Sequence, residues 1–90
     1  MNKITIVIPC YNESDSLPEL IRQLKKVSLD FNFILVDNGS TDNTENILKK
    51  IKFPKNIQVL KKDTNNGYGA GIKYGLSSVK TEFSGWMHAD

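Results

Sequence analysis

Apolar runs alternate along the chain with segments in which hydrophobic residues recur at helical spacing. The apolar runs predict four strands, at residues 3–8, 33–37, 57–61 and 83–87. Spacings of three and four residues predict three helices, at residues 17–27, 43–51 and 69–79. Because Phe33 to Val36 shows no polar alternation, we expect its strand to be covered on both faces, as in parallel sheets. The pattern therefore predicts an α/β fold, a three-layer sandwich with a parallel four-stranded sheet.

Two polar pairs mark where helices are expected to begin. Ser16 and Glu19 have the spacing of a capping box, in which each side chain bonds a backbone N–H of the first turn. Pro18 suits that first turn, because its missing N–H needs no partner there. Asp42 and Glu45 have the same spacing and predict a second capping pair.

Composition excludes several classes of function. Ninety residues accommodate one small domain. The formal charge is +2 and the lysines have no interleaved aromatic residues, so nucleic acid is not expected as a partner. Cys10 is the single cysteine, which leaves neither a disulfide framework nor a Cys/His metal site. We expect it to be a small buried hydrophobe in a reducing compartment.

The longest apolar run, residues 4–10, is too short for a signal peptide or a membrane span. The chain ends at Asp90 directly after an apolar run, with no polar tail or helix to cover it. We therefore expect the sequence to be a fragment of a longer domain.

Asp37 follows the second predicted strand and precedes a Gly-Ser turn. In open α/β sheets, ligands bind at the carboxyl edge, where this carboxylate can accept hydrogen bonds from a base or a sugar hydroxyl. The alternative is an ordinary turn aspartate, since Asp, Asn, Gly and Ser are common turn residues. Asp37 alone does not distinguish the two.

Three glycines, Gly67, Gly69 and Gly71, precede the third predicted helix, and Gly75 lies within it. Glycines at a helix start allow N–H groups to approach a phosphate, and Gly71 and Gly75 allow a helix to lie close to a sheet. A dinucleotide-binding fingerprint follows the first strand of its unit, whereas this loop follows the third. The residues themselves favour packing and turn geometry over direct phosphate contact.

The fourth predicted strand delivers His88, Ala89 and Asp90 to the same edge of the sheet. In an extended segment, alternate side chains share a face, so His88 and Asp90 can address one ion or ligand. Such a pair suits a divalent cation that bridges phosphate oxygens, although a His near an Asp more often forms a structural hydrogen bond.

Four ordered motifs together resemble the nucleotide-sugar-binding half of family 2 glycosyltransferases, which have the GT-A fold. They are residues 7–13, 36–44, 66–72 and 88–90. The resemblance implies that residues 1–90 form the nucleotide-sugar-binding portion of a glycosyltransferase domain, the Rossmann-like half of a GT-A fold, truncated after an Asp-x-Asp-like motif. It also implies an enzyme that transfers a sugar from a nucleoside diphosphate donor to an acceptor hydroxyl.

The resemblance assigns the residues that contact the donor in two groups. Pro9, Tyr11 and Glu13 would border the nucleoside. Asp37 and Asn38 would hold the base.

The remaining assignments concern the nucleotide pocket and the metal. Gly67 would help to shape the nucleotide pocket, and His88, Ala89 and Asp90 would complete the donor site. Asp90 would bind a divalent cation, Mg²⁺ or Mn²⁺, that neutralises charge on the departing diphosphate. His88 stands where the family motif has its first Asp.

The resemblance further implies a UDP- or GDP-linked sugar as partner and a location in the cytoplasm or at the cytoplasmic face of a membrane. The acceptor site and the general base lie beyond the last motif in this family. We therefore assign no catalytic base, and expect the fragment itself to be inactive. Two alternatives are a nucleotidyltransferase or dinucleotide-binding enzyme, and a non-catalytic nucleotide-binding module.

Overall fold

The computed structural model describes residues 4–27, 30–65, 67–87 and 89. In chain order the elements are β1 (Ile4–Cys10), α1 (Leu17–Leu24), β2 (Phe31–Asn38), α2 (Thr44–Lys50), β3 (Ile57–Lys62), α3 (Tyr68–Leu76) and β4 (Phe83–Trp86). Every predicted strand and helix is present. No helix in the described part of the chain is long and apolar enough to cross a membrane.

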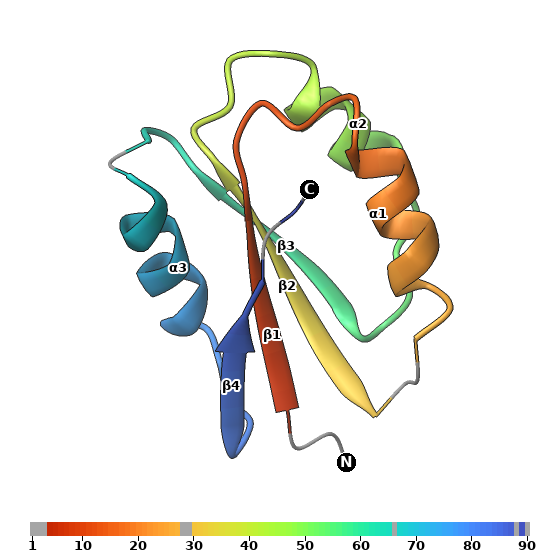
Figure 1. The fold of residues 1–90 in the computed structure, drawn as a ribbon, viewed down its shortest axis with the longest axis vertical. Coiled ribbons are helices and arrows are strands. Elements are labelled where there is room, and N and C mark those ends of the chain that lie inside the picture. The colour runs from red at the N-terminus through yellow and green to blue at the C-terminus, as the bar shows by residue number, and fades with distance from the viewer. Residues whose placement is uncertain (1–3, 28–29, 66, 88, 90) are drawn as a thin grey trace.

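The strands form one parallel sheet in the order β3-β2-β1-β4 (Figure 1). β1 lies inside the sheet, where Ile4 is in register with Phe31 of β2 and with Phe83 of β4. β2 pairs with β3 from Phe33 opposite Ile57 onward. The predicted parallel α/β fold is therefore confirmed.

The helices form the two outer layers: α1 and α2 lie on one side of the sheet and α3 on the other (Figure 1). The chain steps outward from β1 to β2 to β3 and then returns across the sheet to β4. Right-handed crossovers place helices on opposite faces when the direction of stepping reverses. The reversal falls between β1 and β4, and in such sheets ligands bind beside it at the carboxyl edge.

The core is divided by the sheet. On the side of α1 and α2, four leucine and isoleucine side chains of α1 pack with residues of the three strands β1 to β3; the buried members include Ile8, Leu17, Leu20, Ile21, Leu24, Phe33, Leu35, Leu48 and Ile57. On the side of α3 a smaller cluster contains Val7, Ile34 and Val36. Neighbouring residues of β1 and β2 thus enter opposite cores, which explains why their apolar runs lack polar alternation.

α3 lies close to the sheet because two of its three glycines face the strands. A Cβ atom at Gly75 would lie 2.4 Å from Cγ1 of Val7, and one at Gly71 would lie 2.7 Å from Nδ2 of Asn38. The prediction that Gly71 and Gly75 allow tight helix packing is confirmed.

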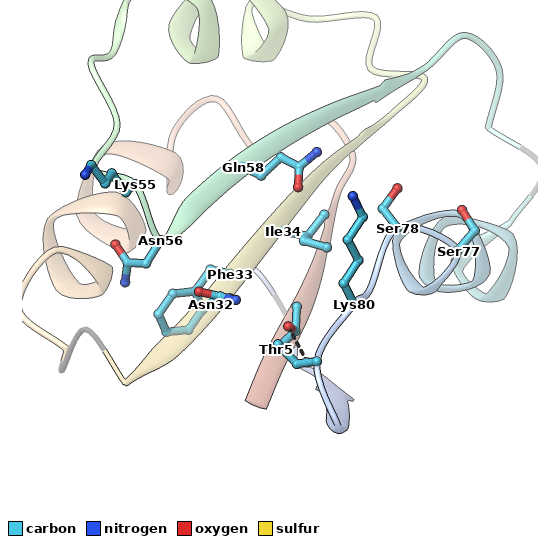
Figure 2. Close-up of a pocket in the computed structure, with 11 residues that line it drawn as sticks. Thr5, Asn32, Phe33, Ile34, Lys55, Asn56, Gln58, Ser77, Ser78 and Lys80 are labelled. Atoms are coloured by element: carbon cyan, nitrogen blue, oxygen red, sulfur yellow. Dashed lines mark hydrogen bonds between the residues drawn. The ribbon is translucent and has the colours of Figure 1, made fainter. Parts of the chain in front are cut away.

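The connection from α3 to β4 is tied to β1 at the amino edge of the sheet. The hydroxyl oxygens of Thr5 and Thr81 lie 2.7 Å apart (Figure 2). The Thr81 hydroxyl also donates to the carbonyl oxygen of Phe83 at 2.8 Å. This chain of hydroxyls fixes the start of β4 beside β1.

Helices α1 and α3 are each shorter than predicted at their carboxyl ends. After Leu24 the N–H of Val27 bonds to the carbonyl of residue 24, and after Leu76 the N–H of Val79 bonds to the carbonyl of residue 76. These three-residue spacings tighten the last turn and end the α-helical pattern. The hydrophobic periodicity continues through both of these turns, so it overestimated the lengths of the two helices.

The predicted capping box of α1 is wrong. The hydroxyl of Ser16 donates to Oε2 of Glu13 at 2.8 Å and makes no cap bond to the helix. The carboxylate of Glu19 binds the guanidinium of Arg22, with Nε 2.7 Å from Oε2. Glu19 thus accepts from a charged donor one turn along instead of from a backbone N–H.

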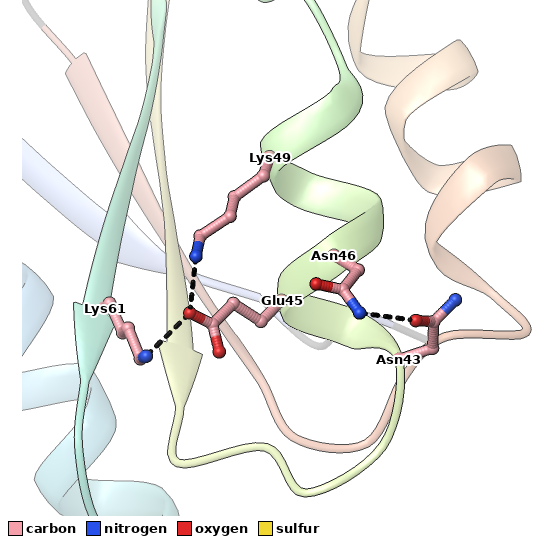
Figure 3. A network of polar contacts seen from close by, with 5 residues as sticks. All are labelled: Asn43, Glu45, Asn46, Lys49 and Lys61. Atoms are coloured by element: carbon pink, nitrogen blue, oxygen red, sulfur yellow. Dashed lines mark hydrogen bonds and ion pairs between the residues drawn. The ribbon is translucent and has the colours of Figure 1, made fainter.

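The predicted capping pair of α2 is also wrong. Asn43 occupies the N-cap position, and Asp42 instead accepts from the N–H of Thr44 at 2.9 Å. Glu45 turns away from the helix start and lies 3.0 Å from Nζ of Lys49 and 2.7 Å from Nζ of Lys61 (Figure 3). Glu45 therefore joins α2 to the edge strand β3.

Candidate functional site

The loops after β1 and β2 are joined by Asn12. Its backbone has a φ of 51°, in the left-handed region that asparagine adopts more readily than most residues. Its Oδ1 accepts from the N–H of Thr41 at 2.8 Å and of Asp42 at 3.2 Å. Its own N–H donates to the hydroxyl of Ser40 at 3.1 Å. One side chain thereby holds two loops in a fixed relation.

A second set of bonds anchors the same loops at Thr44, whose side chain is buried. The Thr44 hydroxyl accepts from the N–H of Glu13 at 3.1 Å and donates to Oδ1 of Asp42 at 2.5 Å. Asp42 also accepts from the N–H of Ser14 at 3.3 Å. The bond from the Thr44 hydroxyl is the largest cause that lowers the pKa of Asp42, to about 2. Asp42 is therefore ionised at neutral pH, where it accepts these hydrogen bonds from the loops after β1 and β2.

Asp37 and Asn38 end β2 and are both buried, with 3% and 2% of their surfaces exposed. As neighbours in a strand they point to opposite faces. Oδ1 of Asp37 accepts from the N–H of Ser40 at 3.3 Å. Nδ2 of Asn38 donates to the carbonyl oxygen of Gly67 at 3.2 Å and so links β2 to the turn before α3.

The amide oxygen of Asn38 is buried and has no hydrogen-bond partner. The space beside this side chain is fixed by Gly71, since any larger residue would collide with the amide. Gly67 itself has a φ of +107° and open space around the position of a Cβ. An unsatisfied acceptor thus belongs to the residue that anchors Gly67.

The β2 and β3 loops approach each other at Gly39. Gly39 has a φ of +69°, and a Cβ there would lie 2.5 Å from the backbone nitrogen of Asn65. Both the conformation and the space require glycine at this position.

Asp37 lines a cavity of about 260 Å³ between α2 and β3. Leu48, Phe53 and Val59 supply apolar walls, and the Glu45–Lys61 ion pair lies at the same cavity. The bond to Glu45 is the largest cause that raises the pKa of Lys61, and Asp37 adds to it. Lys61 therefore places positive charge near the Asp37 carboxylate.

Pro9 and Cys10 at the end of β1 are buried, whereas the Tyr11 side chain is 44% exposed. Burial is the main cause that raises the pKa of the Cys10 thiol to about 12. The thiol stays neutral and packs in the core on the side of α1 and α2. The prediction that Cys10 is a buried hydrophobe is confirmed.

β4 reaches the same edge beside β1. The N–H of Met87 donates to the carbonyl oxygen of Val7 at 3.0 Å, and Ala89 is buried against the core on the side of α1 and α2. His88 and Asp90, on which the predicted metal site rests, lie outside the described residues. Among the described residues there is no group of three His, Cys, Asp or Glu side chains that could hold a metal ion.

The model of the family described as Glycosyl transferase family 2 matches residues 5–90. The chain belongs to glycosyl transferase family 2.

Solved structures of S. aureus TarS have the same fold as this family 2 chain. The chain is 29% identical to TarS 1–349 with a TM-score of 0.83, and the match covers 98% of this chain and 27% of that one. The structure of TarS 1–349 in complex with UDP gives the same values. The complex with UDP-GlcNAc gives a TM-score of 0.84 over 26% of its chain. The match to the Rossmann-like half of a GT-A fold is thereby confirmed, and the chain spans about a quarter of TarS 1–349.

The predicted site residues that the structure describes all lie in segments at the carboxyl edge of this family 2 chain; they are Pro9, Tyr11, Glu13, Asp37, Asn38, Gly67 and Ala89. Sequence reasoning missed Asn12 and Thr44, which hold the edge together. The preference of asparagine for the left-handed region was the available signal for Asn12. The bond between Thr44 and Glu13 had no local signal, because the two residues lie 31 positions apart.

Proposed function

We propose that this chain forms the donor-binding part of a glycosyltransferase that transfers a sugar from a nucleoside diphosphate to an acceptor hydroxyl. The main support is that hydrogen bonds join three loops of the carboxyl edge. Asn12 joins the loops after β1 and β2, and Asn38 joins β2 to the Gly67 turn. A preformed edge binds a ligand without first losing conformational freedom. Membership of family 2 supports a nucleotide-sugar donor as that ligand.

Asp37 and Asn38 are proposed to hold the base. Asp37 is a buried carboxylate that one backbone N–H satisfies at one oxygen. Asn38 has a buried acceptor oxygen without a partner, which a base N–H would satisfy once a shift of the Gly67 turn exposes it. Uracil and guanine both carry a ring N–H, which supports a UDP- or GDP-linked donor.

Pro9, Tyr11 and Glu13 are proposed to border the nucleoside. Pro9 lies near the end of β1, and Tyr11 and Glu13 follow that strand, next to the strand that carries Asp37. The exposed Tyr11 offers an aromatic face and a hydroxyl, which suits contact with a base or ribose. Gly67 would shape the opposite wall of the pocket.

A divalent cation, Mg²⁺ or Mn²⁺, is proposed to bind at Asp90. A carboxylate oxygen is a ligand that both ions prefer. When bound, such an ion neutralises charge that develops on the departing diphosphate. His88 would donate a hydrogen bond to a ribose or diphosphate oxygen, and Ala89 separates the two side chains. The acceptor site and general base are left to the remainder of the enzyme, so the 90-residue chain should not transfer sugar alone.

The neutral, buried Cys10 thiol supports a reducing location, in the cytoplasm or at the cytoplasmic face of a membrane. A dinucleotide-binding enzyme has less support, because its glycine loop would follow β1, where this chain has Tyr11, Asn12 and Glu13.

The test is titration of UDP and GDP, each with Mn²⁺, into the complete protein and its Asp37→Ala variant. Loss of a charged acceptor should weaken binding of the preferred nucleotide by about 1.5–3 kcal/mol, or roughly tenfold to a hundredfold. Asp15→Ala is the matched control, because Asp15 is an exposed aspartate with no assigned role. Equal affinity of wild type and Asp37→Ala for both nucleotides would make Asp37 a turn residue.

A further inference from the structure

A cavity of about 430 Å³ lies at the amino edge of the sheet, opposite the edge that carries the proposed donor site (Figure 2). Its walls come from the starts of β1 and β2, the segment that leads into β3, and the residues that follow α3. Its volume lies in the range of small-molecule sites. No function assigned above uses it.

One wall of the cavity contains Asn56, which is 7% exposed. Its side-chain Nδ2 donates to the backbone carbonyl oxygen of Phe31 at 3.0 Å, and its backbone carbonyl oxygen accepts from the N–H of Phe33 at 2.7 Å. Its amide oxygen is buried and has no partner. A buried polar atom without a partner is costly, so this wall favours a ligand or water that donates a hydrogen bond.

The hydroxyls of the cavity also present acceptors. Because Thr81 donates its proton to Phe83, Thr5 must donate to Thr81, which leaves lone pairs on the Thr5 oxygen. The Ser77 hydroxyl donates to the carbonyl of Tyr74 at 2.6 Å and likewise keeps its lone pairs. These groups suit a ligand rich in hydroxyl donors.

The charges that line the cavity have one sign. Lys55 and Lys80 are among its lining residues, and no Asp or Glu is. In Figure 2 the Lys80 side chain extends between Ile34 and Ser78, whereas Lys55 lies at the far end of the cavity. The lining therefore favours an anion, and Lys80 is the cation best placed to bind it.

The carboxyl end of α3 lies at this cavity and would by itself repel an anion. Its last carbonyls are already occupied, however. The carbonyl of Gly75 accepts from the N–H of Ser78 and that of Leu76 from the N–H of Val79. The hydroxyl of Ser77 donates a hydrogen bond to the carbonyl oxygen of Tyr74. These bonds reduce the partial negative charge at the carboxyl end of the helix. The full positive charge of Lys80 is larger than the roughly half charge that such an end carries.

We propose that this cavity binds a small phosphorylated sugar or polyol. The phosphate would lie against the exposed Lys80, and the hydroxyls would bond to the buried acceptors of Asn56 and Thr5 once a shift of the cavity wall opens them. Such a site is separate from the carboxyl edge, so its occupant does not compete with a nucleotide.

The test is calorimetric titration of glucose 6-phosphate into the complete protein saturated with UDP, which blocks the donor site. Lys80→Gln should weaken binding roughly tenfold or more, because it removes a charge-assisted contact. Lys52→Gln is the matched control, since Lys52 is an exposed lysine that does not line the cavity. Glucose and inorganic phosphate, titrated separately, should each bind more weakly than glucose 6-phosphate.

Amide shifts in NMR spectra locate the probe, and those of Gln58, Ser78 and Thr81 should move. Three results would overturn the proposal: no binding to the UDP-saturated protein, equal affinity of wild type and Lys80→Gln, or equal affinity for phosphate alone. UDP affinity, measured on the same variants, should not change with Lys80→Gln. That measurement separates failure of this site from failure of the donor site.

Discussion

Gly69 and Gly75 lie in the same helix but in different surroundings, so alanine at the two positions should change stability in opposite directions. A Cβ at Gly69 would meet no atom within 4 Å, whereas one at Gly75 would lie 2.4 Å from Cγ1 of Val7 and 3.0 Å from Cγ2 of Val36. Alanine in a helix gains up to about 1 kcal/mol over glycine. Gly75→Ala, unlike Gly69→Ala, must also displace the side chains of Val7 and Val36.

The cost at Gly75 follows from how firmly its neighbours are held. Val7 and Val36 are fully buried and lie in the two central strands, and β-branched side chains have few alternative rotamers. Overpacking of this kind costs about 1–3 kcal/mol. Gly75 lies next to the end of α3, so the helix gain is taken as about 0.5 kcal/mol and Gly75→Ala should lose about 0.5–2.5 kcal/mol of unfolding free energy. Gly69→Ala, near the helix start, should gain roughly 0.5 kcal/mol.

Urea denaturation of the complete protein, followed by circular dichroism, measures both effects. Val7→Ala supplies an internal check, because it removes two of the three methyl groups that the new Cβ would meet, including the nearest one at 2.4 Å. In that background Gly75→Ala should destabilise the protein less than in the wild type, since only the contact with Val36 remains. If Gly75→Ala is as stable as Gly69→Ala in the wild-type background, α3 does not lie as close to β1 as the structure indicates.

Three further results are expected. The pKa of Asp42 falls from 3.8 to about 2 on folding. Its ionised form therefore stabilises the fold above pH 3.8, and this contribution is lost as the pH falls to about 2. In Asp42→Asn the thermal midpoint of unfolding should depend less on pH over that interval than in the wild type. Cys10, fully buried with a pKa raised to about 12, should react with a thiol reagent only as the chain unfolds, and rapid labelling of the native protein would contradict its burial. Mn²⁺ should enhance nucleotide binding in wild type and in His88→Asp but not in Asp90→Ala; the reverse pattern would exchange the two roles.

The elements that were predictable depend on local pattern. Continuous apolar runs identified β1 and β2, since both are covered on two faces, and the spacing of Gly71 and Gly75 indicated close packing of α3. The capping pairs failed although their spacing was correct. Glu19 had a cation one turn away, and a spacing rule does not compare competing partners.

The parts that were not predictable depend on contacts between distant residues. Asn12 bonds to Thr41, 29 residues away, and its role exists only once β1 and β2 are paired. Likewise, the sequence placed Asp37 and Asn38 at one edge but did not show that Asn38 holds the Gly67 turn. The predicted roles of His88 and Asp90 stay predictions.

The return of the chain across the sheet has a consequence for synthesis on the ribosome. Apart from Ala89, the core on the side of α1 and α2 is built from β1 to β3 and their two helices, within residues 4–62. In the described part of the chain, the opposite face, with Val7, Ile34 and Val36, is covered by α3 and by Val79 after it, which are made later. A nascent chain that has reached β3 therefore exposes an apolar sheet face, together with the unpaired edge of β1 that β4 will occupy. Exposed apolar surface and open strand edges promote aggregation, so this is the stage of synthesis at which a chaperone would protect the chain most.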